Sequence, residues 1–96
     1  MPYGYVIGQI TVTKPEDYPA YVERVGPILE KFGGEFLVRG GRHEIHEGPA
    51  PGDRVVIIRF PSYAKAVEWY HSDEYAEAKA MRMAASTSVQ TIVEGI

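Results

Sequence analysis

The sequence predicts an α+β fold in which an antiparallel four-stranded sheet carries its helices on one face. Two observations support this prediction. Stretches rich in β-branched residues alternate with stretches of helical spacing in the order strand, helix, strand, strand, helix, strand. The sharpest change of spacing follows the apolar run RVVIIRF at residues 54–60, where a Pro-Ser break precedes the helical segment AKAVEWYHSDEYAEAKAMR.

The first strand is expected at residues 3–12, which are rich in Tyr, Val, Ile and Thr. The T-x-x-E form of Thr13–Glu16 resembles a capping box, so a helix should follow it. Pro15 and Pro19 disturb the first turn of that helix, which leaves Asp17 as an alternative cap.

This first helix has the clearest periodicity in the chain. Pro27 removes a backbone donor inside it and is expected to kink it near Gly26. Gly33-Gly34 should end it. Its apolar residues share one helical face: Tyr18, Tyr21, Val22, Val25, Ile28, Leu29 and Phe32.

The other three strands follow from composition and turn residues. A second strand is expected at residues 35–39, followed by a bend at Gly40-Gly41 and a short extension at 44–47 that ends in the loop GPAPGD. Residues 54–60 are the third strand. Residues 87–94, TSVQTIVE, are expected to form the last one because of their β-branched content.

Two serines mark helix starts in the second half of the chain. Ser62 is placed to cap a helix over residues 63–70, and Ser72 to cap another over 73–85. The resulting order of elements is that of a ferredoxin-like βαββαβ subunit. Because no repeat or linker interrupts it, residues 1–96 are expected to form a single domain.

Both faces of the predicted sheet are apolar. Residues 55–58 are four consecutive Val and Ile residues, and Val6, Ile7 and Ile10 include apolar side chains of both parities. Two helices cover only one face of such a sheet. The least costly cover for the other face is the same face of a second copy, so we expect a homodimer with a barrel-like β core.

Composition narrows the possible partners. The net charge is -3 with acids and bases interspersed, which argues against nucleic acid and anionic lipid. The absence of cysteine excludes disulfides and thiolate chemistry and suits a reducing compartment. No apolar run approaches the ~20 residues of a membrane helix, and no leader precedes the first strand. We therefore expect a cytoplasmic protein that does not contact membranes.

An ordered set of segments resembles the domain of unknown function family 1330, and the resemblance covers essentially the whole chain. It implies membership of the dimeric α/β-barrel superfamily, in agreement with the expected homodimer, and it implies no established activity. The matching segments are GGEFLVRGG at 33–41, EIHEG at 44–48, RVVIIRFPS at 54–62, WYHSDEY at 69–75 and VEG at 93–95.

Arg82 is the strongest candidate for a ligand-binding residue. Lys79 and Ala78 precede it by one turn, so it has no carboxylate partner there. One interpretation is an anion clamp beneath Tyr75 and Trp69, which would hold a carboxylate by two parallel hydrogen bonds. The alternative is an arginine that crosses the sheet edge or pairs with a glutamate on a strand.

Other residues could complete such a pocket. Trp69 and Tyr70 could wall it, although large aromatics on a helix more often serve the core or a dimer interface. Arg39 lies late in the second strand and could face the same cavity as Arg82. His43 could shuttle a proton, because its ordinary pKa lies near 6.5.

The histidines at 43 and 46 could form a metal site with Glu44 or Glu47, but solvated edge-strand residues are the interpretation that we favour. They are three residues apart in an extended segment, where their side chains point to opposite faces, whereas the H-E-x-x-H zinc site needs a spacing of four on a helix. We expect no metal and no cofactor, and phosphate-loop or nucleophile-elbow motifs are absent from the sequence.

Two main functions remain open from the sequence, and a haem or metal enzyme is a third possibility. The first is a protein that binds or transforms a small organic anion in a pocket lined by Arg39, Trp69, Tyr75 and Arg82. The second is a non-catalytic dimerisation or accessory module without a small-molecule site, in which Trp69 is buried with no cavity beside it.

Overall fold

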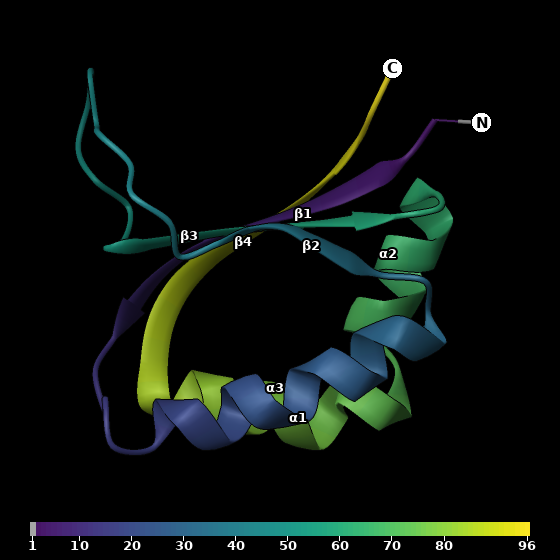
Figure 1. Cartoon of the computed structure of the whole chain (residues 1–96), viewed down its shortest axis with the longest axis horizontal. Coiled ribbons are helices and arrows are strands. Elements are labelled where there is room, and N and C mark those ends of the chain that lie inside the picture. The colour runs from purple at the N-terminus through teal and green to yellow at the C-terminus, as the bar shows by residue number, and fades with distance from the viewer. Residues whose placement is uncertain (1) are drawn as a thin grey trace.

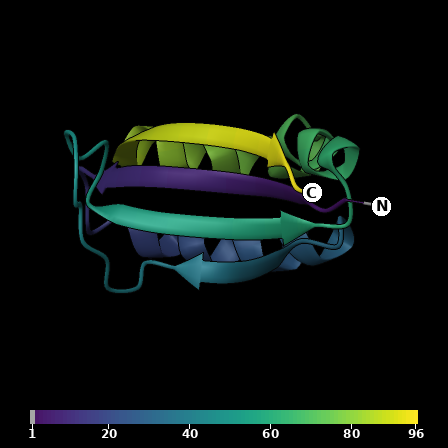
Figure 2. The same ribbon diagram turned by 90° about the horizontal axis from the view of Figure 1, so that it is seen from above.

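The computed structural model describes residues 2–96 and confirms the predicted fold class. The elements in chain order are β1 (Gly4–Val12), α1 (Tyr18–Lys31), β2 (Glu35–Arg39), β3 (Arg54–Phe60), α2 (Tyr63–Tyr70), α3 (Asp73–Ala85) and β4 (Ser86–Glu94). Neighbouring strands are antiparallel, and they follow the order β2-β3-β1-β4 across the sheet. All three helices lie on one side of the sheet, as Figure 1 and Figure 2 show.

The serine caps explain where α2 and α3 begin. The hydroxyl of Ser62 accepts a hydrogen bond from the backbone amide of Lys65 at 3.1 Å. The hydroxyl of Ser72 accepts one from the amide of Tyr75 at 3.2 Å. Both caps confirm the prediction, and each satisfies an amide that the first turn of a helix leaves without a partner.

Helix α1 begins at the alternative cap, Asp17, and not at the predicted capping box. Asp17 makes no side-chain hydrogen bond to the helix. The amide of Thr13 donates to the carbonyl of Ala85 at the end of α3, so Thr13 belongs to the turn before the helix. The helix continues through Pro27 and ends before Gly33, whose φ of 75° gives the predicted stop.

The core lies between the helices and the face of the sheet that they cover. Val6 pairs with Ile58 and Gly8 with Val56, so alternate residues of β1 and β3 point toward the helices. Burying each large apolar side chain there stabilises the fold by about 1.5–3 kcal/mol. The largest fully buried side chains are Trp69, Tyr75, Phe60, Leu29 and Val6.

The opposite face of the sheet is also apolar, and no helix in the part of the chain described covers it (Figure 1). Val89 and Val93 on the edge strand β4 are 49% and 42% exposed. Apolar side chains are therefore present on both faces, as predicted, and polar residues such as Gln9, Arg59 and Thr91 share the uncovered face. The side chains that share this uncovered face by register include Tyr5, Ile7, Val38, Val55, Ile57, Val89 and Val93.

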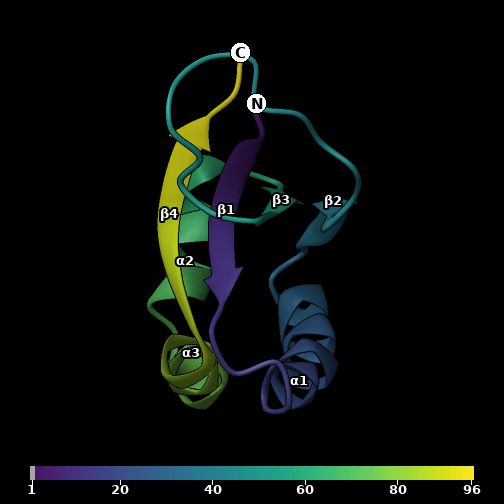
Figure 3. The same cartoon turned by 90° about the vertical axis from the view of Figure 1, so that its left-hand side faces the viewer.

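The connection between β2 and β3 rises on the uncovered side of the sheet. Figure 1 and Figure 3 show it and the two chain ends extending away from the helices. Gly40 opens this connection with a φ of 72°, which confirms the predicted bend. The expected extension at 44–47 pairs with no strand, and Ile45 within it is 47% exposed.

Two glycine substitutions should test the packing with opposite signs. A Cβ at Gly4 would stand against the backbone of Ser62 and Tyr63, so Gly4→Ala should destabilise the fold by about 1–3 kcal/mol. A Cβ at Gly26, inside α1, meets no atom within 4 Å. Gly26→Ala should therefore raise the free energy of unfolding by about 0.5–1 kcal/mol. Urea denaturation of both variants measures these changes, and a stable Gly4→Ala variant would contradict the packing described for β1.

Candidate ligand-binding site

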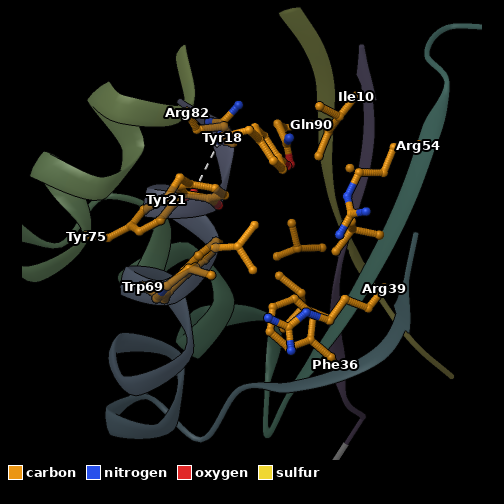
Figure 4. Close-up of a pocket in the computed structure, with 16 residues that line it drawn as sticks. Ile10, Tyr18, Tyr21, Phe36, Arg39, Arg54, Trp69, Tyr75, Arg82 and Gln90 are labelled. Atoms are coloured by element: carbon orange, nitrogen blue, oxygen red, sulfur yellow. Dashed lines mark hydrogen bonds between the residues drawn. The ribbon is translucent and has the colours of Figure 1, made fainter. Parts of the chain in front are cut away.

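A cavity lies between the helices and the covered face of the sheet (Figure 4). Its enclosed volume is about 30 Å³, whereas the space including its open mouth is about 450 Å³. The smaller volume decides what fits without movement, which is one or two waters or a group of a few atoms. The labelled residues in Figure 4 come from all the helices and strands: Ile10, Tyr18, Tyr21, Phe36, Arg39, Arg54, Trp69, Tyr75, Arg82 and Gln90.

Arg82 lies at the wall of this cavity and is only 3% exposed. Its guanidinium donates through Nε to the Tyr75 hydroxyl at 3.3 Å, through Nη1 to Ser88 Oγ at 2.8 Å and through Nη2 to the Tyr70 hydroxyl at 3.4 Å. The contact to Ser88 follows from topology, because α3 passes directly into β4 and the strand returns alongside the last helical turn.

The surroundings of Arg82 hold no carboxylate. None of the residues that line the cavity is an acid, and no ion pair among residues 2–96 includes Arg82. Burial alone lowers the pKa of this guanidinium, but its electrostatic interaction and hydrogen bond with Tyr75 outweigh that effect and raise the pKa above its ordinary value. Arg82 is therefore a buried cation whose hydrogen-bond partners are the hydroxyl groups of Tyr75, Ser88 and Tyr70.

A pair of tyrosine hydroxyls stands next to Arg82. Tyr21 and Tyr75 lie 2.8 Å apart, oxygen to oxygen, and the Tyr75 ring stacks on Trp69 with centroids 4.2 Å apart. One of the two hydroxyl groups donates its proton to the other. Arg82 is the donor in its own bond to Tyr75, so that bond uses no tyrosine proton. Either Tyr21 or Tyr75 therefore keeps a proton that it can donate to a group in the cavity.

Two further arginines face the cavity. Arg54 comes from β3, and its guanidinium packs so closely on Gly40 that a side chain there would collide with it. Arg54 Nε is buried without a hydrogen-bond partner. Arg39 comes from β2 and stacks over the ring of Phe36, with 4.5 Å from Cζ to the ring centroid. Figure 4 shows Arg39 and Phe36 together at one end of the cavity.

Gly8 and Gln90 form part of the sheet side of the cavity. A Cβ on Gly8 would lie 3.0 Å from Gln90 Oε1, because the Gln90 amide rests across this glycine. Gln90 Nε2 donates to Ser88 Oγ at 3.2 Å. The amide oxygen of Gln90 therefore stays available as an acceptor at the cavity wall.

The structure brings four of the six predicted site residues to the cavity: Arg39, Trp69, Tyr75 and Arg82. Tyr70 contacts Arg82 but lines a separate outer cleft. His43 lies elsewhere, in an exposed hollow of the β2–β3 connection with Arg42 and Glu44.

Among the lining residues with polar side chains, sequence reasoning missed four: Tyr18, Tyr21, Arg54 and Gln90. Tyr18 and Tyr21 were assigned to the apolar face of α1, which is correct but says nothing of their hydroxyls. Arg54, Val56 and Ile58 are alternate residues of one strand, so their side chains point to the same face. This alternation is the one signal in the sequence that Arg54 points toward the helices.

Neither a metal centre nor a membrane helix is found among residues 2–96. No three His, Asp or Glu side chains gather where they could hold a metal ion. His46 instead lies 3.8 Å from Glu44, and both are exposed. No helix is both long and apolar enough to span a bilayer.

The buried tyrosine predicts a loss of stability in alkali. Burial, followed by the influence of Tyr75, raises the pKa of Tyr21 far above its ordinary value. Only the unfolded chain then releases this proton near pH 10, so the free energy of unfolding should fall as the pH rises above about 10. Tyr21→Phe should make that fall shallower by up to about 1.4 kcal/mol per pH unit in denaturation experiments.

A matched control is Tyr63→Phe, because Tyr63 is 43% exposed on α2. This substitution should leave the alkaline profile close to that of the unmodified protein. Parallel profiles for Tyr21→Phe and the unmodified protein would contradict the burial described for Tyr21.

Known structures share this fold. The protein RPA0582 of unknown function from Rhodopseudomonas palustris is 26% identical, with a TM-score of 0.78 over 99% of this chain and 83% of its own. SnoaB, a cofactor-independent oxygenase from Streptomyces nogalater, is 12% identical, with a TM-score of 0.66 over 97% and 92%. Rv0793 from Mycobacterium tuberculosis is 18% identical, with a TM-score of 0.57 over 98% and 95%.

No functionally curated protein matches the chain. The family model for DUF1330, a domain of unknown function, matches residues 3–96. This match and the shared fold confirm the resemblance inferred from the sequence. The chain therefore belongs to the DUF1330 family.

Proposed function

We propose that this protein binds a small organic anion in the cavity between its helices and sheet. The single observation that carries the proposal is the position of Arg82, a cation 97% buried that has hydroxyl partners and no carboxylate. Arg39 and Arg54 add two positive charges to the same lining. An anionic group is the ligand that this charge distribution favours.

The physical reason is the cost of a buried charge. Removing a guanidinium from water costs several kcal/mol unless an opposite charge or a complete set of hydrogen bonds compensates for it. Three of the five Arg82 N–H groups donate to Tyr75, Ser88 and Tyr70. A bound carboxylate would accept from the remaining donors and neutralise the charge, so ligand binding should stabilise the fold.

The lining also suits an anion that changes during a reaction. A group bound beside Arg82 would lie near the Tyr21–Tyr75 pair, which has one proton to donate. The phenol proton would pass to the carbon of a bound enolate and leave a tyrosinate near the Arg82 guanidinium, which is general acid chemistry. We therefore propose proton transfer to a bound anion as the reaction, and it can occur only if the anion binds at Arg82.

The alternative function, an accessory module with no small-molecule site, expects Trp69 to be buried without a cavity beside it. Trp69 is 2% exposed, but it lines the cavity together with Arg82. The cavity therefore favours the ligand-binding function over this alternative.

We also propose that two copies of the chain associate through their uncovered sheet faces. That face exposes Val89 and Val93 beside other apolar residues, and burying such area from water stabilises an interface. Two-fold symmetry lets the same patch serve both copies. The cavity lies on the other side of the sheet, so it would stay accessible in such a dimer.

The anion proposal predicts that Arg82→Met abolishes ligand-induced thermal stabilisation. Methionine keeps an unbranched stem in the core while removing all five donors. A carboxylate that binds the site, supplied at a concentration 100 times its Kd, should raise the free energy of unfolding of the unmodified protein by about 2.7 kcal/mol. It should not raise that of the variant. Differential scanning fluorimetry with a panel of small carboxylates measures this difference.

Arg24→Met is the matched control, because Arg24 is an exposed arginine paired with Glu77. It should respond to the panel as the unmodified protein does. Equal stabilisation of the Arg82→Met variant would sink the proposal, and so would a panel that stabilises none of the proteins.

The dimer proposal predicts that Val89→Asp shifts the protein toward monomers. The carboxylate would be buried in the interface without a partner, which should weaken association on the order of 100-fold. Met83→Asp is the control, since Met83 is 63% exposed on α3, away from that face. Sedimentation velocity across a concentration series compares the two, and a monomeric unmodified protein would contradict the proposal.

A further inference from the structure

A second hollow lies on the outer side of Arg82, between α3 and the edge strand β4, and is called the outer cleft below. Its volume is about 340 Å³, much larger than the enclosed cavity. Arg82 and Gln90 line both spaces, so these two side chains form the partition between them. The full lining of the outer cleft is Tyr70, Arg82, Met83, Ser86, Thr87, Ser88 and Gln90.

The chemistry of the outer cleft differs from that of the cavity. Four of its seven lining residues carry hydroxyl groups, another is an amide, and none is an acid. The cavity is walled instead by apolar and aromatic side chains such as Val6 and Trp69. Hydroxyls and amides both donate and accept, which matches the neutral hydroxyl groups of a ligand.

Hydrogen-bond counting leaves two protons directed at no partner in the described residues. Ser88 Oγ accepts from Arg82 Nη1 and from Gln90 Nε2, so both of its lone pairs are used and its proton remains. The Tyr70 hydroxyl accepts from Arg82 Nη2 and keeps its own proton as well. Ser88 and Tyr70 are therefore donors at the wall of the outer cleft, fixed in place by the guanidinium.

The enclosed cavity alone is too small for most organic anions. Its 30 Å³ admits a carboxylate group but not the chain attached to it. Widening it on the helix side would displace Trp69 and Tyr75, which are 2% and 1% exposed core residues. Gln90 is only partly buried and ends in an amide that can turn, so the partition is the easier side to open.

We propose that the outer cleft is a subsite for the hydroxylated chain of a ligand whose carboxylate binds at Arg82. The ligand class is a polyhydroxy or hydroxy carboxylic acid, with its anionic end on the cavity side of the partition and its hydroxyl groups against Tyr70 and Ser88. This inference rests on the proposed anion binding and adds the chemical class and the direction of the ligand.

The test compares three carboxylates by isothermal titration calorimetry on the full chain. Acetate probes the carboxylate site alone, gluconate adds a hydroxylated chain, and hexanoate adds an apolar chain of equal carbon number. Gluconate should bind at least about tenfold more tightly than hexanoate, because only its hydroxyl groups satisfy the donors of the outer cleft.

Met83→Trp should fill part of the outer cleft from its exposed rim. It should weaken gluconate binding about tenfold or more and leave acetate binding unchanged. Tyr63→Trp is the matched control, since Tyr63 is exposed on α2 and does not line the cleft.

The outcomes separate the two proposals. Acetate binding that depends on Arg82, together with equal gluconate affinity in Met83→Trp and the unmodified protein, overturns the subsite and leaves the anion site standing. Hexanoate binding as tightly as gluconate also overturns it, without the use of any variant. Binding of none of the three acids to the unmodified protein overturns the anion site and the subsite together.

Discussion

One layer of helices for a sheet with two apolar faces is the constraint from which the other properties of this molecule follow. Helices α1, α2 and α3 all lie on a single side of the sheet. Trp69, Tyr75 and Phe60 are almost completely buried in the core on that side. The covered side can therefore be shaped in detail and can enclose a polar group. The other side retains exposed valines, and covering them would remove apolar surface from water.

Arg82 shows how polar chemistry is held inside the covered side. Its guanidinium connects α3 to β4 through Ser88 and to the end of α2 through Tyr70, so one side chain joins three elements. The carbonyl of the same residue accepts from Ser86 at 2.6 Å, at the point where the helix becomes the strand. A cation in this position connects elements of the fold and would also attract an anion in the cavity.

The fold could be predicted from local patterns because these determine most of its elements. The spacing of Tyr18 to Leu29 identifies a helix by itself, and Ser62 and Ser72 mark helix starts through bonds that span three residues. The uninterrupted apolar run at 55–58 likewise revealed a strand with both faces apolar. Each of these signals needs no knowledge of distant residues.

Local patterns could predict only part of the candidate site. Arg82 was recognised because its own helix offers no carboxylate, which is a local observation. Arg54 and Gln90 reach the cavity through strand register, and register depends on pairings between segments far apart in the chain. His43 was a candidate for its chemistry alone, and the long connection that carries it takes a direction that no local pattern encodes.

Gly8 makes the shape of the cavity sensitive to a single substitution. A glycine in the middle of a strand gives up packing and adds disorder to the unfolded chain, and here the space left by its missing side chain is occupied by the Gln90 amide. One methyl group at this position would displace that amide and alter the partition between the cavity and the outer cleft. The shape of the cavity can therefore change through one small substitution at a buried backbone position, without any alteration of the charged residues.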